Sequence, residues 1–128
     1  MLNDSKVEAN IPAADLQRAR TFYADTLGLT PVQDLGVNLV YETAGGTRFN
    51  IYETTFAGQA GHTIAQWHVD DIESEVRDLQ GKGVSFEVYD DMPGVEWNDG
   101  IASIKGMGKA AWFKDSEGNT MCLDQAES

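Results

Sequence analysis

The sequence predicts an α+β domain, and three observations point to this fold class. A strand-like segment is followed by a helix whose apolar residues recur every three or four positions. The same strand–helix unit returns later in the chain, where Asp71 stands 56 residues after Asp15. Other segments alternate between polar and apolar side chains, as strands with one buried face do. Two units of this size could not each bury a sheet face alone, so we expect them to share one core.

The first unit begins with a strand over residues 7–11, which is expected to stop at Pro12 because a central strand does not tolerate proline. Asp15 is a suitable N-cap for a helix over residues 15–27. Gly28 ends this helix, because a residue without Cβ adopts positive φ at low cost. The buried stripe of the helix is expected to contain Leu16, Ala19, Phe22, Tyr23 and Leu27.

The second unit repeats this order with a strand over residues 63–69, an N-cap at Asp71, a helix over residues 71–80 and a stop at Gly83. Further strands are expected at residues 30–34, 38–43, 48–53, 85–89 and 120–124. Residues 101–114 are expected to contain another strand, loosened by Gly106 and Gly108. Residues 44–47 and 115–119 are predicted to be tight turns, and residues 90–100 a loop.

Composition excludes several classes of partner. The net charge of −12 and the pI near 4.3 disfavour nucleic acid and anionic membrane surfaces. No segment is apolar over a bilayer-spanning length, and no basic leader is visible. Cys122 is the single cysteine, which rules out an internal disulfide and fits a reducing compartment. We therefore expect a cytoplasmic protein with a neutral or cationic small-molecule ligand.

Residue parity divides four of the strands into two faces. Their odd-numbered residues are apolar and are expected beneath the helices, where Trp67 should join the core. Trp112 is expected to pack where the two units meet. The even-numbered set is mostly polar and consists of Glu8, Asn10, Arg48, Asn50, Tyr52, Ile64, Gln66, His68, Thr120, Cys122 and Asp124. This face is either a solvated sheet surface or the wall of a ligand cavity.

The chain resembles the vicinal-oxygen-chelate superfamily of glyoxalases, bleomycin-resistance proteins and extradiol dioxygenases. Three stretches carry the resemblance, namely residues 15–29, residues 69–84 and residues 111–119. The resemblance implies two βαβββ modules that form one curved mixed eight-stranded sheet with the helices on its convex side. Module one would cover residues 7–54, the linker 55–62 and module two 63–125. Residues 89–101 are similar to a functionally obscure subgroup.

The resemblance also implies where a metal would bind. Metal-dependent members hold their ion at four points on the cavity face, which correspond here to Glu8, Asn50, Ile64 and Cys122. Glu8 is the only plausible ligand among them, since Asn50 is a poor ligand, Ile64 is none, and Cys122 would suit soft Zn²⁺ more than Fe²⁺ or Mg²⁺. No HxH, HExxH or CxxC spacing offers another site. We therefore expect neither a metal nor another cofactor.

Two residues are candidates for special roles. His68 could act as a general base oriented by Glu8, Asn50 or Asp124, or it could be a hydrogen-bonded cavity wall. Trp97, in the acidic 90–100 loop, is expected either to stack on a ligand as part of a lid or to lie at a subunit contact. The candidate ligand-binding residues are Asn10, Arg48, Asn50, Tyr52, Gln66, His68, Trp97, Cys122 and Asp124.

These observations lead to one preferred function and two rivals. The preferred function is a metal-independent binding protein that sequesters an aromatic or cationic compound. The first rival is an enzyme, either a metal-dependent lyase, isomerase or dioxygenase that uses Glu8 and His68, or a metal-free acid–base catalyst. The second rival is a structural dimer module with an empty groove. The resemblance implies a homodimer in each case.

Overall fold

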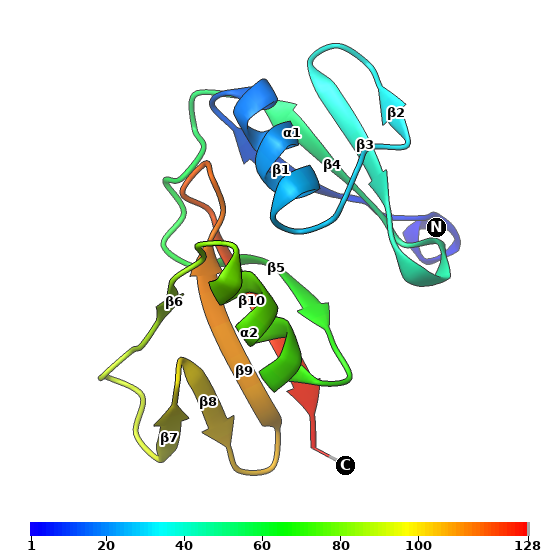
Figure 1. Cartoon of the computed structure of the whole chain (residues 1–128). Coiled ribbons are helices and arrows are strands. Elements are labelled where there is room, and N and C mark those ends of the chain that lie inside the picture. The colour runs from blue at the N-terminus through cyan, green and yellow to red at the C-terminus, as the bar shows by residue number, and fades with distance from the viewer. Residues whose placement is uncertain (128) are drawn as a thin grey trace.

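The computed structural model describes residues 1–127 and contains two mixed sheets, each with a helix packed on one side (Figure 1). Sheet A has the strand order β1-β4-β3-β2, and sheet B has the order β5-β10-β9-β8-β7, with β6 also pairing with β9. The helical segments are η1 (Leu2–Asp4), α1 (Leu16–Asp25), η2 (Ala44–Gly46) and α2 (Ile72–Gly81). The strands are β1 (Ala9–Ala13), β2 (Gln33–Asp34), β3 (Asn38–Glu42), β4 (Arg48–Glu53), β5 (Thr63–His68), β6 (Phe86–Glu87), β7 (Val95–Asn98), β8 (Ile101–Ile104), β9 (Gly108–Lys114) and β10 (Thr120–Ala126).

The predicted α+β fold of two βαβββ-type modules is confirmed. We call β1 to β4 with α1 module one, and β5 to β10 with α2 module two. In both modules the first strand pairs in parallel with the last, β1 with β4 and β5 with β10. The expected single eight-stranded sheet is not observed, because hydrogen-bonded pairing within residues 1–127 divides the strands between sheets A and B.

Both helices begin where the sequence predicts. The Asp15 carboxylate accepts a hydrogen bond from the Arg18 N–H at 3.0 Å, and the Asp71 carboxylate accepts one from the Ser74 N–H at 3.2 Å. These bonds satisfy N–H groups that have no partner within the first turn. Gly28 has a φ of 73°, the left-handed geometry expected at the end of α1. Neither helix has the length and apolar character that crossing a bilayer would require.

The first strand is shifted from its predicted position. β1 runs from Ala9 through Pro12 to Ala13, whereas residues 7–11 were expected. Pro12 is tolerated because β1 lies at the edge of sheet A and pairs only with β4. The predicted burial of Val7 is wrong, since its side chain is 92% exposed.

A β-bulge in β5 changes which residues face outward. Thr63 pairs with Thr120 and Ala65 pairs with Met121, so Ile64 is the extra residue between them. Ile64 packs against the core, whereas Thr63 accepts a 3.2 Å hydrogen bond from the Trp112 indole. The prediction that Ile64 belongs to the polar face is therefore wrong, and Thr63 takes that place.

The predicted 90–100 loop is wrong in its second half. β7 and β8 form a hairpin whose turn is Asp99-Gly100, with φ values of 52° and 79°. Positive φ at both turn residues matches the right-handed twist of paired strands. Residues 101–114, which were expected to contain one loosened strand, contain two, because β8 ends at Ile104 and β9 begins at Gly108.

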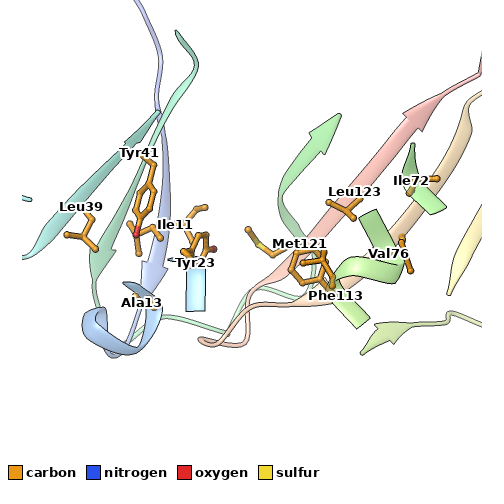
Figure 2. Close-up of a cluster of buried hydrophobic side chains, with 14 of the residues drawn as sticks. Ile11, Ala13, Tyr23, Leu39, Tyr41, Ile72, Val76, Phe113, Met121 and Leu123 are labelled. Carbon is orange, nitrogen blue, oxygen red and sulfur yellow. The ribbon is translucent and has the colours of Figure 1, made fainter. Parts of the chain in front are cut away.

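One hydrophobic core joins the two modules. Figure 2 shows buried side chains from both sheets, with Tyr23 and Met121 on the facing sides of the two groups. Trp67 packs against this core as predicted, and its ring meets Phe49 edge-on with centroids 6.4 Å apart. α1 packs on β4, and α2 packs on β9 and β10. We call the opposite side of each sheet its open face.

Candidate functional site

A hollow of about 310 Å³ lies on the open face of sheet B, and we call it the sheet-B hollow. Adjacent strands supply its polar wall, because register places Gln66 beside Cys122 and His68 beside Asp124. Side-chain alternation directs all four away from α2. The complete lining is Thr63, Gln66, His68, Ile104, Met107, Gly108, Lys109, Ala110, Trp112, Cys122, Asp124, Gln125 and Ala126.

The Asp124 carboxylate links two side chains of β5. Its Oδ1 lies 2.6 Å from Nδ1 of His68, and its Oδ2 accepts a 3.1 Å hydrogen bond from Nε2 of Gln66. The His68 side chain is 80% exposed, whereas that of Asp124 is 27% exposed. Among the three residues predicted to orient His68, the structure brings Asp124 into contact with the imidazole.

Cys122 forms the floor of the hollow. The residue is 3% exposed, and its Sγ–H donates a 3.3 Å hydrogen bond to the carbonyl of Leu123. Burial raises the pKa of the thiol to about 11, and the nearby charge of Asp124 acts in the same direction. The thiol is therefore protonated at neutral pH, and it offers a ligand a small apolar surface rather than a nucleophile.

Three aromatic rings from different segments of module two gather beside the hollow. Trp112 lies 5.6 Å from Tyr89 and 6.0 Å from Trp97 between ring centroids, and Tyr89 lies 6.2 Å from Trp97. Register places Trp112 opposite Cys122, so this indole stands on the open face. The predicted packing of Trp112 at the module junction is wrong, because its ring partners belong to module two.

Trp97 does not lie in a loop. It sits on β7, is half-buried, and pairs across the hairpin with Ala102. Its ring packs against Trp112 and Tyr89 of the same chain. The structure therefore places Trp97 behind Trp112 as a support, and Trp97 is not part of the lining of the sheet-B hollow.

A second hollow of about 340 Å³ shares Thr63 and Trp112 with the first and extends toward Tyr89. The Tyr89 hydroxyl donates a 2.5 Å hydrogen bond to Glu87, whose other oxygen lies 3.1 Å from the Lys114 ammonium. Burial raises the pKa of Tyr89 to about 12, and the bond to Glu87 adds to this shift. That bond is also the largest cause lowering the pKa of Glu87.

The predicted ligand residues of module one lie on the open face of sheet A. Asn50 donates a 3.0 Å hydrogen bond to Glu8, and Arg48 pairs at 2.8 Å with Glu42 rather than with Glu8 or Glu53. Glu8, Asn10, Arg48 and Tyr52 are exposed. A hollow of about 520 Å³ at this end of the sheet is lined by Lys6, Val7, Glu8, Glu42, Gly46, Thr47 and Arg48.

The candidate residues therefore form two groups instead of lining one cavity. Within residues 1–127, no hydrogen bond or ion pair joins the Glu8 group of sheet A to the His68 group of sheet B.

Sequence reasoning missed Thr63, which the bulge turns outward, and Tyr89, which lies outside the four strands considered. Trp112 could have been found, since it shares parity with the polar residues of its antiparallel partner β10. A larger hollow of about 590 Å³ adjoins the β8–β9 turn and contains none of the predicted residues.

The side chains at the four family-type metal positions do not fit a metal ion. Glu8 is hydrogen-bonded to Asn50, which supplies only a neutral amide. Ile64 has no donor atom and packs against the core, and Thr63, which takes its place, offers only a neutral hydroxyl. The Cys122 thiol is buried and donates its hydrogen bond to the Leu123 carbonyl. In the part of the chain that the structure describes, no three His, Cys, Asp or Glu side chains are grouped as metal ligands.

Comparisons with known proteins agree with this fold. The family model described as "Glyoxalase/Bleomycin resistance protein/Dioxygenase superfamily" matches residues 7–123. A comparison with curated protein sequences found no match.

Three solved structures illustrate the range of similar folds. TnmS3, an antibiotic binding protein from Streptomyces sp. CB03234, is 22% identical, with a TM-score of 0.69 over 96% of this chain and 98% of that one. A bleomycin-binding protein complexed with bleomycin is 18% identical, with a TM-score of 0.70 over 96% and 99%. A mutant of the fosfomycin resistance protein FosX from Listeria monocytogenes, complexed with Mn(II) and 1S,2S-dihydroxypropylphosphonic acid, is 15% identical, with a TM-score of 0.68 over 94% and 89%. At these identities the likeness is one of fold.

Proposed function

Because this chain belongs to the glyoxalase/bleomycin resistance protein/dioxygenase superfamily, we propose that it binds a small planar aromatic or cationic compound in the sheet-B hollow without a metal ion. The observation that carries the proposal is that the Trp112 indole and the Asp124 carboxylate both line the same hollow. An indole face attracts flat rings and cations, and a carboxylate favours positive charge. The net charge of −12 attracts cationic ligands over longer distances.

The size of the hollow and the buried state of Cys122 support reversible binding rather than covalent capture. Its volume of about 310 Å³ lies at the lower end of the range for small-molecule sites. Cys122 is protonated and buried, so it supplies contact area instead of a reactive thiolate. Similar folds include an antibiotic binding protein and a bleomycin-binding protein, which is consistent with a role in sequestering a compound.

Isothermal titration calorimetry and tryptophan fluorescence with two planar dyes of opposite charge test this proposal. Proflavine is cationic at neutral pH, and 9-anthracenecarboxylate is anionic and of similar shape. We expect proflavine to bind and quench tryptophan fluorescence, and the anionic ring to bind more weakly. Replacing Trp112 by Ala should weaken proflavine binding by about tenfold, which corresponds to roughly 1.4 kcal/mol.

The matched control replaces Phe56, an aromatic residue that is 72% exposed and outside the hollow. Phe56→Ala should bind proflavine as the natural protein does. Equal loss in the Trp112 and Phe56 variants would contradict binding in the sheet-B hollow. If Tyr52→Ala loses binding while Trp112→Ala keeps it, the site lies on sheet A instead.

The metal-dependent enzyme is the rival function, and elemental analysis of untagged protein decides between the two. The donor set at the four family-type positions favours the metal-independent alternative, because Asn50 and Ile64 cannot replace carboxylate or imidazole ligands. Stoichiometric Zn, Mn, Ni or Fe in the purified protein would overturn the metal-independent proposal.

We further propose that the protein pairs with a second copy of itself. Exposed apolar side chains gather around the β2 edge of sheet A, where Val32, Leu35 and Val37 are 56%, 55% and 67% exposed. Such a patch on a small domain fits a protein contact. Light scattering should give about twice the chain mass of 14.0 kDa. A single-chain mass across the accessible concentration range would contradict pairing.

A further inference from the structure

His68 is held at one ring nitrogen and free at the other. Its Nδ1 lies 2.6 Å from Oδ1 of Asp124, and no partner is found for Nε2 within residues 1–127. A carboxylate accepts hydrogen bonds and does not donate them, so the proton of the neutral imidazole belongs on Nδ1. Nε2 then carries the lone pair, which is the atom a proton acceptor needs.

Gln66 fixes the orientation of Asp124. Its Nε2 donates to Oδ2 of Asp124 at 3.1 Å, so one carboxylate oxygen is occupied and the other faces His68. Both contacts connect neighbouring positions on β5 and β10, where register places His68 opposite Asp124. The chain Gln66–Asp124–His68 is therefore built on paired strands rather than on a loop, which limits its movement.

The surroundings of His68 suit proton transfer from a bound ring. His68 and Trp112 both line the sheet-B hollow, and Cys122 contributes an apolar floor. The charged side chains of the hollow are Asp124 on β10 and Lys109 on β9, and Lys109 is paired with Glu73 of α2. Asp124 is consequently the charge that faces the imidazole directly.

We propose that His68 is a general base positioned by Asp124 and Gln66, so that the sheet-B hollow removes a proton from a planar compound with an acidic C–H or O–H at its edge. This inference rests on ligand binding in the same hollow, and it adds a reaction to it. The proton moves to Nε2 and gives an imidazolium beside the Asp124 carboxylate, which stabilises the new charge.

The aromatic probe 5-nitrobenzisoxazole reports this step directly. When Nε2 takes the proton from C3, the electrons of the C–H bond form the nitrile and the N–O bond breaks. The product is 2-cyano-4-nitrophenolate, which is coloured, and the imidazolium then releases its proton to water. No oxidant, reductant or other co-reactant is required.

Three variants separate the roles of these residues. His68→Gln should lower kcat by about 100-fold, a typical contribution of a general base, while KM stays within a few-fold. In Asp124→Asn, Gln66 still donates to the side-chain oxygen, which turns the new amide N–H toward Nδ1. Nε2 then carries the proton and cannot accept another, so kcat should fall by roughly tenfold or more. His62→Gln, at the other histidine of the chain, should leave the rate unchanged.

Long-range proton–nitrogen NMR provides a readout that a merely structural role would not move. The chain has 2 histidines, so His68→Gln assigns the spectrum. The neutral imidazole of His68 should carry its proton on Nδ1, and Asp124→Asn should shift it to Nε2.

Two results would overturn the inference. One is a probe reaction no faster than with free imidazole at equal concentration, or equally fast in His68→Gln. The other is a neutral His68 protonated on Nε2 in the natural protein. If proflavine still binds in either case, the binding function stands and only the base is lost. If proflavine binding and the probe reaction are both lost, the proposed binding site in the sheet-B hollow fails as well.

Discussion

The carboxylate of Glu117 accepts two hydrogen bonds from the guanidinium of Arg18, at 2.8 Å from Nε and 2.9 Å from Nη2. The same carboxylate accepts a 2.9 Å bond from the backbone N–H of Asp15. The turn between β9 and β10 in module two is thereby fastened to the first turn of α1 in module one. Glu117 is 7% exposed, so its charge is compensated by these donors rather than by water.

Replacing Glu117 by Gln should remove an acid-sensitive part of the stability. Burial alone would raise the pKa of Glu117, but hydrogen bonds from Arg18, the Asp15 N–H and Ser116 outweigh it and lower the pKa to about 2. The folded pKa lies below the ordinary value of 4.5, so the stabilisation is complete above about pH 4.5 and is lost as the pH falls toward 2. We expect Glu117→Gln to lower the unfolding free energy by roughly 2–3 kcal/mol at pH 7. In denaturant titrations at acid pH, the unfolding free energy of the variant should fall less with decreasing pH than that of the natural protein.

The control for this experiment is Glu53→Gln, which changes an exposed carboxylate at the end of β4. Its unfolding free energy should follow the natural protein across the acid range. If the unfolding free energy of Glu117→Gln depends on acid pH as that of the natural protein does, Glu117 titrates in the folded protein as it does in the unfolded chain.

Removing the hydroxyl of Tyr23 should destabilise the protein. Its O–H donates a 2.8 Å bond to Asp115, and both residues are buried at the junction between the modules. Burial, together with the charge of Asp115, raises the pKa of Tyr23, so the phenol remains a donor throughout the physiological range. Hydrogen bonds to charged groups contribute about 1.5–3 kcal/mol, and Tyr23→Phe should cost an amount in this range in urea unfolding.

The corresponding change at Tyr41 should have the opposite sign. The Tyr41 hydroxyl is buried and has no hydrogen-bond partner among the residues described. An unpaired buried hydroxyl lowers stability, so Tyr41→Phe should leave the unfolding free energy unchanged or raise it by up to about 1 kcal/mol. The ring stacks on Phe49 at 5.0 Å and is retained in the variant. A loss of stability as large as that in Tyr23→Phe would indicate that the hydroxyl is paired after all.

Gly108 should tolerate no side chain. A Cβ at this position would lie 2.2 Å from the carbonyl oxygen of Gln125, and φ is +120°. Gly108→Ala must therefore separate β9 from β10 beside the sheet-B hollow, and we expect a loss of about 3 kcal/mol or more in thermal or denaturant unfolding. Gly106→Ala is the matched control, since φ is +85° but no atom lies within 4 Å of its Cβ. That variant should lose only about 1 kcal/mol, the cost of the backbone conformation alone.

Cys122 should react slowly with alkylating reagents. Because burial raises the thiol pKa to about 11, only a small fraction is thiolate at pH 8, and access is also restricted. The rate with iodoacetamide should be about 100-fold below that of the unfolded chain in guanidinium at the same pH. Equal rates in the two states would mean that the floor of the hollow opens readily.

Short local signals in the sequence sufficed to predict the modules. Asp15 and Asp71 each cap a helix, and the turn from Asp115 to Asn119 closes as expected, with the Asp115 carboxylate accepting bonds from two backbone N–H groups. These features depend on neighbouring residues only. The Asp99-Gly100 pair carried an equally local hairpin signal, and the β7–β8 hairpin could have been predicted from it.

The candidate site was less predictable because it depends on pairing between distant strands. Parity correctly grouped Gln66, His68, Cys122 and Asp124, which register brings together in sheet B. It could not reveal that sheet A and sheet B are separate, since the alternation within a strand does not show which other strand it pairs with. This is why Glu8 and His68, assigned to one hollow, lie in different groups.

The bulge at Ile64 has a consequence for how such a protein could change its chemistry. The additional residue turns the Ile64 side chain away from the open face of sheet B and places the Thr63 hydroxyl there instead. Substituting Ile64 by Glu would drive a carboxylate toward the core, whereas Thr63→Glu would present it beside Trp112. To place a metal ligand on the open face of β5, evolution would therefore have to delete one residue of the bulge or substitute Thr63 rather than Ile64.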